Sequence, residues 1–275
     1  MLIAHLNGER VDAELARRDD AFCCPVCREV VILRRGRKVV AHFAHRPRAR
    51  CVARTGETRA HLEAKRVLLD SFRTRGLRAE AEYATTEVAE DRRADIMVWS
   101  PGSDIPLAIE LQHSRITVPE LEKRAQSFAR AGIGQLWVPF LDDGSLLRAE
   151  PIAPGRVRIE RYPTPFHMLW MAALVGAAGL WMYQPVACKF WRADFTDHML
   201  MTKEAIWYEM GALKQYRQGG ERRSRRFRTL YLEGPWSPAD LRLRIFRRHA
   251  DASEWFNWPD ARVATFVPVA MPKGS

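Results

Sequence analysis

Apolar and polar residues alternate on both sides of a Pro-Gly-Ser-Asp segment at 101–104, and this pattern predicts a β-hairpin over Arg92–Gln112. In a symmetric hairpin, Asp95 lies opposite Glu110. Glu110 and Gln112 point the same way, because residues two apart on a strand share a face. The hairpin therefore gathers two carboxylates and one carboxamide on a single patch.

The spacing of apolar residues also predicts helices and strands on both sides of this hairpin. Apolar residues recur at helical spacing from Thr58 to Arg75, and weak alternation predicts a strand over 77–88. Thr117 and Glu120 form a capping box for a helix that ends at Gly132, and a short apolar strand follows it. The predicted order is helix, three strands, helix and strand.

Residues 166–183 are nearly uncharged and about as long as a minimal membrane span. The segment contains His167, Gly176 and Gly179, and it divides into a buried helix and a strand that begins at Leu180. We therefore favour no membrane span.

The remaining C-terminal region predicts a strand over Phe190–Phe195 and then a flexible, arginine-rich loop over Lys214–Arg228. That loop holds seven basic residues and the single acid Glu221. Such a loop suits a nucleic-acid backbone, and a merely solvated loop is the alternative. We expect three tryptophans of the tail to pack on the body of the protein: Trp236, Trp255 and Trp258.

The charge changes the functional picture. The 275 residues include 44 Lys and Arg against 33 Asp and Glu, a net charge of +11. This excess favours a polyanionic partner, with nucleic acid ahead of acidic membrane. The first ten residues are too polar for a signal peptide, and four of the five cysteines lie between Cys23 and Cys51. Because such a cluster is typical of metal sites in a reducing compartment, we expect a cytoplasmic protein.

The cysteine cluster predicts a structural zinc site. A CxxC motif is followed by a hairpin that turns at Gly36 and brings two histidines and a further cysteine back to it. Zinc takes four sulfur or nitrogen ligands, so five candidates compete for four places. His42 is the alternative ligand, and Cys23 is expected outside the set. The favoured ligands are Cys24, Cys27, His45 and Cys51.

The same module is strongly basic, with no acid between residues 30 and 56. This charge suits a phosphate backbone, although a solvated basic face would have the same composition. The basic residues are Arg34, Arg35, Arg37, Lys38, Arg46, Arg48, Arg50 and Arg54.

Two carboxylates as close as Asp95 and Glu110 repel each other unless a cation or a proton lies between them, and hard oxygen ligands suit Mg²⁺ or Mn²⁺. Glu57, His61 and Lys65 lie four residues apart along one stripe of the preceding helix. This stripe is either an exposed, salt-bridged face or a second wall of the same metal site. The alternative for the hairpin carboxylates is a solvated edge.

The CPVC knuckle, the HFAH segment, the helical H-x3-K pair, the RRAD strand and the AIELQ strand occur here in an order that resembles the CoiA family of competence proteins. The resemblance covers roughly residues 20–140. That family is similar to a zinc-finger-fronted member of the PD-(D/E)xK nuclease superfamily. It implies an α/β (α+β) fold in three parts: a zinc-finger-like β module at 1–54, a restriction-endonuclease-like αβββαβ core at 55–150 and a mixed C-terminal extension at 151–275.

The resemblance also implies that Asp95 and Glu110 bind the divalent metal and that Glu57 and His61 contact the active site. Gln112 lies where the superfamily usually carries lysine. Glutamine can hydrogen-bond a water but brings no charge, and Lys65 is a candidate for the missing cation.

Our leading hypothesis is a metal-dependent nuclease or DNA-processing factor that handles incoming single-stranded DNA for recombination during transformation. The alternative is a catalytically inactive DNA-binding adaptor that assists recombination proteins. The catalytic candidates are Asp95, Glu110, Gln112, His61, Glu57 and Lys65. The candidate nucleic-acid contacts are Arg34, Arg35, Arg37, Lys38, Arg92, Arg93, Arg124, Arg222, Arg223, Arg225 and Arg226.

Overall fold

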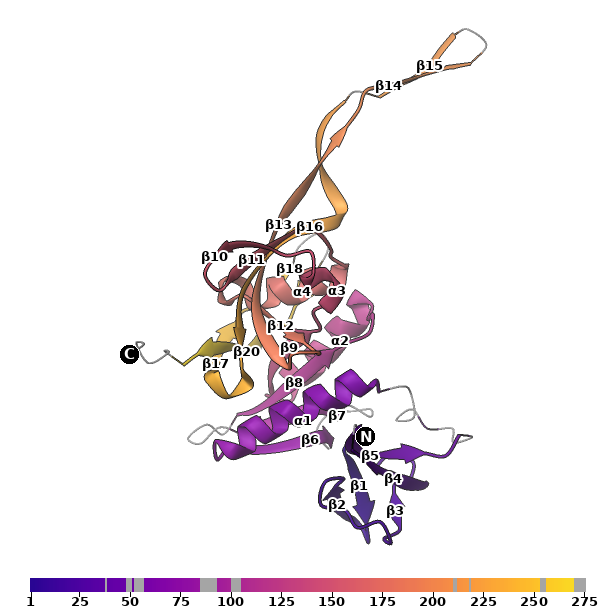
Figure 1. Ribbon diagram of the computed structural model, residues 1–275, viewed down its shortest axis with the longest axis vertical. Coiled ribbons are helices and arrows are strands. Elements are labelled where there is room, and N and C mark those ends of the chain that lie inside the picture. The colour runs from indigo at the N-terminus through magenta and orange to yellow at the C-terminus, as the bar shows by residue number, and fades with distance from the viewer. Residues whose placement is uncertain are drawn as a thin grey trace.

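A computed structural model describes residues 1–269 of the chain, except 38, 48–50, 52–56, 85–92, 100–104, 210–211, 218 and 253–255. Figure 1 shows a small β module at the amino end, a central body of sheets and helices, and a long two-stranded arm that projects from the body.

The amino-terminal module is a five-stranded antiparallel sheet in the order β2-β1-β3-β4-β5. The amide of Phe43 donates to the carbonyl oxygen of Met1 at 2.8 Å, so the last strand also bonds to the start of the chain. Phe22, Val31 and Phe43 are buried in its core. Its strands are β1 (Ile3–Leu6), β2 (Glu9–Asp12), β3 (Phe22–Cys23), β4 (Val30–Gly36) and β5 (Val39–His45).

The central part has the predicted order of helix, three strands, helix and strand. The hairpin is symmetric, because Trp99 pairs with Pro106 and Ile96 pairs with Ile109. Thr58 and Thr117 cap the two helices through their hydroxyl groups. The elements are α1 (Arg59–Thr74), β6 (Arg78–Ala84), β7 (Arg93–Trp99), β8 (Pro106–Gln112), α2 (Val118–Arg130) and β9 (Gly134–Pro139).

The C-terminal region shares this sheet. β20 (Ala261–Pro268) runs parallel to β9, and β17 (Leu241–Arg248) adds the outer strand, which gives the order β17-β20-β9-β8-β7-β6. Trp181 from the C-terminal half is fully buried, and its indole donates to the Thr265 hydroxyl at 3.0 Å. Residues beyond 150 thus complete the core around the central sheet. The remaining elements before β12 are α3 (Asp143–Leu146), β10 (Glu150–Ala153), β11 (Arg156–Pro163), α4 (Phe166–Val175) and η2 (Gly176–Ala178).

Residues 166–183 form the predicted helix and strand, with β12 (Leu180–Gln184) starting at the predicted residue. Trp170 and Leu174 of α4 are fully buried against the body. Within the described ranges, no helix has both the length and the apolar character needed to cross a membrane.

The arm corrects the predicted flexible loop over Lys214–Arg228. β13 (Lys189–Thr202) and β16 (Gly220–Trp236) pair along most of their length, and β14 (Ala205–Glu209) and β15 (Ala212–Arg217) continue the ribbon (Figure 1). The prediction was wrong because it weighed charge density alone, whereas the long partner strand satisfies the backbone hydrogen bonds of this basic segment. The other short elements are η3 (Pro238–Asp240), β18 (Asp251–Ala252) and β19 (Asn257–Trp258).

Of the tail tryptophans, Trp258 is buried and Trp236 packs on Trp181 at 5.2 Å between ring centroids. Trp255 lies outside the described residues.

Ionic contacts attach the amino-terminal module to α1 and β6. Asp12 accepts hydrogen bonds from Arg66 at 2.5 and 3.2 Å and from Arg73 at 3.0 Å. Glu82, which is buried, accepts from the amide of Leu2 at 2.8 Å and from Lys65 at 2.6 Å. Each module therefore supplies partners for charges buried at the junction.

Candidate functional site: a sulfur cluster and a carboxylate pocket

The four favoured zinc ligands lie together at one end of the amino-terminal module. One ligand atom from each lies within 4.8 Å of every other. The sulfur atoms of Cys24 and Cys51 are 4.0 Å apart, and the Cys27 sulfur lies 3.4 Å from Nε2 of His45. Tetrahedral zinc with bonds of about 2.3 Å to sulfur separates two sulfurs by about 3.8 Å, so the cluster has the spacing that zinc needs.

The local backbone explains this geometry. The amide of Val26 points at the Cys24 sulfur at 3.4 Å, and the amide of Arg28, which has a positive φ of 61°, donates to the carbonyl of Cys24. The turn between the two CxxC cysteines therefore aims both thiols at one point. The rival His42 donates from Nδ1 to the Val40 carbonyl of its own strand, and Cys23 lies outside the cluster.

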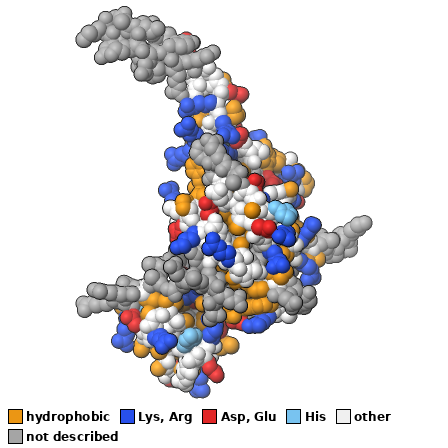
Figure 2. All heavy atoms as spheres, turned by 180° about the vertical axis from the view of Figure 1, so that it is seen from behind, with side chains coloured by type: hydrophobic (Ala, Val, Ile, Leu, Met, Phe, Trp, Pro, Cys, Tyr) orange, Lys and Arg blue, Asp and Glu red, His pale blue; other side chains and the backbone are white. Residues whose placement is uncertain are grey.

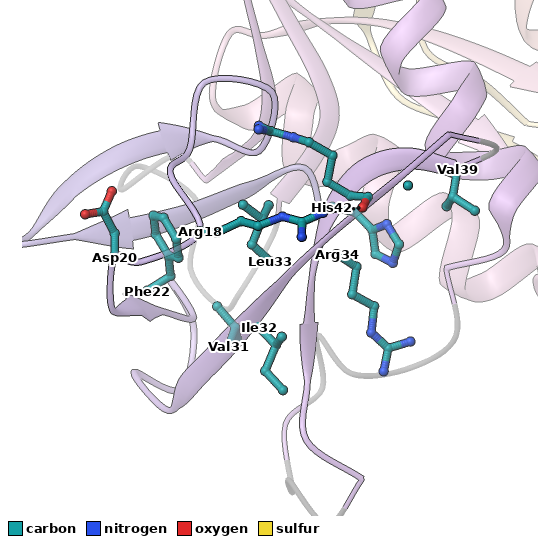
Figure 3. A pocket seen from close by; sticks show the side chains of 11 residues that line it. Arg18, Asp20, Phe22, Val31, Ile32, Leu33, Arg34, Val39 and His42 are labelled. Atoms are coloured by element: carbon teal, nitrogen blue, oxygen red, sulfur yellow. Dashed lines mark hydrogen bonds between the residues drawn. The ribbon is translucent and has the colours of Figure 1, made fainter.

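A shallow hollow of about 760 Å³ lies on another face of this module. Figure 3 shows Arg18, Arg34 and His42 around it, together with the apolar side chain of Ile32. Arg34 and His42 are a register pair on β4 and β5. Arg35 differs, because its guanidinium donates to three backbone carbonyls of the 13–16 turn and so supports the module itself.

A second, smaller hollow of about 220 Å³ lies where α1 meets the ends of β7 and β8. It contains most of the catalytic candidates. Asp95 accepts hydrogen bonds at Oδ2 from Nε2 of His61 at 3.1 Å and from the amide of Leu111 at 2.9 Å. The other ring nitrogen of His61 lies 3.4 Å from Glu57. The hairpin and the helix thus bring three potential ligands together, Glu57, His61 and Asp95, within 4.8 Å of one another.

Glu110 lies beside this group on β8 and is nearly inaccessible to solvent. One of its oxygens accepts a hydrogen bond from Arg124 of α2, and the other is buried without a partner in the described part of the chain. Arg124, predicted as a nucleic-acid contact, therefore lies inside the pocket. Its guanidinium also lies over the ring of Trp137.

Burial and neighbouring charges shift the pKa values in this pocket. Burial raises the pKa of Glu110 to about 7, and the negative charge of Asp95 adds to the rise although Arg124 opposes it. Burial alone would lower the pKa of His61, but the carboxylates of Asp95 and Glu57 outweigh it and raise that pKa to about 9. The pocket therefore holds excess negative charge that a cation or a proton must balance.

Gln112 and Lys65 differ in their access to the pocket. Gln112 lines it, and its amide nitrogen donates to the Ser114 carbonyl at 2.5 Å. Lys65 is completely buried beneath Glu57, where it bonds Glu57 and Glu82. Its ammonium group orients these two carboxylates from below.

The remaining basic candidates fall into two groups. Arg93 lies 3.6 Å from Glu82, and Arg223 lies 3.5 Å from Asp197, so both have acidic partners. Lys38 and Arg92 lie outside the described residues. Arg223 is exposed as well, and the other exposed candidates are Arg34, Arg37, Arg222, Arg225 and Arg226.

Glu82 is the residue that sequence reasoning missed. It is 2% exposed, has a positive φ of 51° and joins the start of the chain to Lys65. In the sequence it is one of several acids in a weakly alternating strand, so no local signal separates it from a solvated glutamate.

The chain is similar in sequence to one family of known proteins. Residues 6–54 match the model of the CoiA N-terminal domain, and residues 57–149 match that of the CoiA nuclease-like domain. The chain is 30% identical over 135 residues to the competence protein CoiA of Bacillus subtilis, a match that covers 49% of this chain and 35% of the relative. No solved structure matches the chain. The two domain models occur in family order and together match just over half of the sequence, so this chain belongs to the CoiA family of competence proteins.

Proposed function

We propose that the pocket at α1, β7 and β8 is a metal-dependent nuclease site that acts on DNA phosphodiesters. The observation that carries the proposal is the convergence of Glu57, His61 and Asp95 beside the buried Glu110. Such a concentration of carboxylates next to exposed arginines suits a divalent cation and a polyanionic substrate. The nuclease-like family match supports the same proposal.

The donor set fits Mg²⁺ or Mn²⁺. An octahedral site with bonds of about 2.1 Å places ligand atoms about 3–4.2 Å apart, which is within the 4.8 Å spread of this group. The two hydrogen bonds that Asp95 accepts from described residues both use Oδ2, which leaves Oδ1 for a ligand, and one oxygen of Glu110 has no partner among the same residues. A bound divalent ion would supply a Lewis acid that neutralises charge on the phosphoryl group.

The side chains around these ligands have separate roles. Lys65 holds Glu57 in place from the buried side, and the amide of Leu111 holds Asp95. Arg124 reaches the pocket from α2 and places a positive charge where charge develops on the phosphodiester. Gln112 orients the attacking water through its carboxamide, the role that lysine has in the wider superfamily.

The test is cleavage of end-labelled single- and double-stranded DNA in Mg²⁺, Mn²⁺ or EDTA. The variants Asp95→Asn and Glu110→Gln keep the side-chain shape and remove the charge. We expect each to lose at least about a hundredfold in rate while DNA affinity is retained. Cleavage that persists in EDTA, or in both variants, would contradict the proposal.

A second candidate is a DNA-binding adaptor without catalysis that assists recombination proteins. It is favoured by one observation: Arg124 already neutralises Glu110, and Gln112 brings no charge to the position. DNA that is bound but never cut, with variants that behave like the parent, would support the adaptor. In either case the zinc cluster would stabilise the basic module that contacts the phosphate backbone.

A further inference from the structure

A groove leads from the carboxylate pocket to the C-terminal part of the chain. The pocket shares Gln112, His113 and Ser114 with an adjoining hollow of about 390 Å³. The opposite wall of this hollow comes from the start of α4 and from β16, both of which lie beyond the family-matched region. We call this hollow the α4 groove.

The α4 groove is positively charged. Arg115, Arg225 and Arg226 line it, and no acidic side chain of the described residues does. Arg225 and Arg226 are exposed and lack a carboxylate partner within the described chain, whereas the neighbouring Arg223 is held by Asp197. Figure 2 shows Lys and Arg side chains on the arm below its grey tip, with some acidic side chains among them. The groove thus has unneutralised charge next to the proposed reaction centre.

Aromatic rings line the same hollow as these charges. Phe166 is 54% exposed at the mouth of the groove, and His113 is exposed and packs edge-on against Phe140 with ring centroids 4.8 Å apart. Exposed rings stack on unpaired bases, whereas the bases of a duplex already stack on one another. A groove lined by both cations and exposed rings therefore suits a single strand.

The amino end of α4 adds to this charge. Pro165 begins the helix without a side-chain cap, and the first turn contains no acid. The adjacent His167 is 7% exposed, lines the groove and has no hydrogen-bond partner in the described ranges. The positive end of the helix dipole favours an anionic group here, and the ring of His167 can donate a hydrogen bond to it.

We propose that the α4 groove binds a single nucleic-acid strand and leads it to the carboxylate pocket, with Arg225 and Arg226 on the phosphates and Phe166 stacked on a base. That the strand is led to the pocket rests on the proposed nuclease function. Binding of the strand in the groove does not depend on cleavage. The extension after the family-matched region then supplies half of the substrate path.

The test measures binding in EDTA, so cleavage plays no part. A fluorescein-labelled 20-nucleotide thymidylate strand and a duplex of the same length are titrated with the full chain by anisotropy at several salt concentrations. The groove variant is Arg225→Ala with Arg226→Ala. The matched control is Arg242→Ala with Arg244→Ala, which removes the same charge from exposed positions on β17.

Each lost phosphate contact lowers the logarithmic salt slope by about 0.7 on a single strand, so the groove variant should lose about 1.4. At 0.1 M salt this corresponds to about 25-fold weaker binding. Phe166→Ala should weaken the single strand at least about fivefold and the duplex much less. The control variant, Arg242→Ala with Arg244→Ala, should bind the single strand and the duplex about as tightly as the parent does.

Equal losses in the groove and control variants would overturn the inference, because they would indicate a general charge effect. So would a Phe166→Ala variant that binds the single strand normally. Weakened binding in the groove variants of a protein that never cuts DNA would support the groove and contradict the nuclease. Groove variants that bind normally, in a protein that still cuts DNA, would contradict the groove inference and leave the nuclease proposal intact.

Discussion

Replacing Asp12 by asparagine should loosen the amino-terminal module from the rest of the protein. The carboxylate is 8% exposed and connects β2 with α1 through Arg66 and Arg73. Asparagine keeps the shape but removes the charge that both guanidinium groups contact. Arg66, itself buried, would then lack its main partner.

The free energy lost in Asp12→Asn follows from how exposed each arginine partner is. Hydrogen bonds to a buried charged group contribute about 1.5–3 kcal/mol, and this range applies to Arg66. The side chain of Arg73 is 40% exposed, so solvent screening limits its contribution to about 0.5 kcal/mol. The total is about 2–3.5 kcal/mol, which corresponds to about 30- to 300-fold faster opening.

Amide hydrogen exchange followed by mass spectrometry measures this opening directly. Peptides from β1 and β2 of Asp12→Asn should exchange faster than those of the parent by the factor given above, while peptides from β9 and β20 should not change. Asp19→Asn, an exposed acid of the same module, is the control and should shift stability by less than about 0.5 kcal/mol. Unchanged exchange in β1 and β2 would refute the reasoning.

The contact between Asp12 and Arg66 also makes the stability of the amino-terminal module depend on pH. Burial alone would raise the pKa of Asp12, but hydrogen bonds from Arg66 outweigh it and lower that pKa below its ordinary value. Stabilisation from a depressed carboxylate is present above the unfolded pKa of about 3.9 and is lost as pH falls through the folded pKa. The difference between parent and Asp12→Asn should therefore stay constant from pH 7 to about 5 and shrink below about 3.9.

Three further changes test other parts of the structure. Zinc analysis should find about one ion per chain, lost in Cys24→Ser and Cys51→Ser and kept in Cys23→Ser and His42→Gln; loss of zinc in His42→Gln would overturn the ligand set. Lys65→Met should cost about 3–5 kcal/mol in denaturant unfolding, because the buried Glu82 would lose its nearest cation and Glu57 would lose one of its cationic partners; a neutral effect would contradict the network. Trp181→Ala should lower the melting temperature by about 6–20 °C, since its ring packs against Trp236 and Phe266; a change below 2 °C would mean that the C-terminal region does not complete the core.

Local spacing was enough to predict the zinc-type cluster and the carboxylate hairpin. Cys24 and Cys27 are fixed by their own turn, and the symmetric hairpin follows from the turn residues and strand alternation. Both features depend on neighbours within a few tens of residues. The helix and strand within 166–183 were predictable for the same reason, because Gly176 and Gly179 divide an apolar run.

The arm and the groove could not be predicted in this way. β16 pairs with β11 and β13 across long stretches of sequence, and its register is set by tertiary contacts that leave no local period. The contact of Arg124 with Glu110 joins a helix to a strand in the same manner. Charge density along the sequence therefore identified the arginines but not the surfaces on which they lie.

Helix α1 connects the parts of the molecule that sequence reasoning treated separately. Its residue His61 faces the carboxylate pocket, Arg66 holds Asp12 of the amino-terminal module, and Lys65 lies between them. Lys65 is completely buried and bonds both Glu57 at the pocket and Glu82, which in turn accepts the amide of Leu2. A shift of the module would break the bond from the Leu2 amide to Glu82 and would move the amino group of Met1, which lies 2.9 Å from Glu57, away from the pocket. The geometry of Glu57 in the pocket therefore depends on how firmly the cysteine-bearing module is attached to this helix.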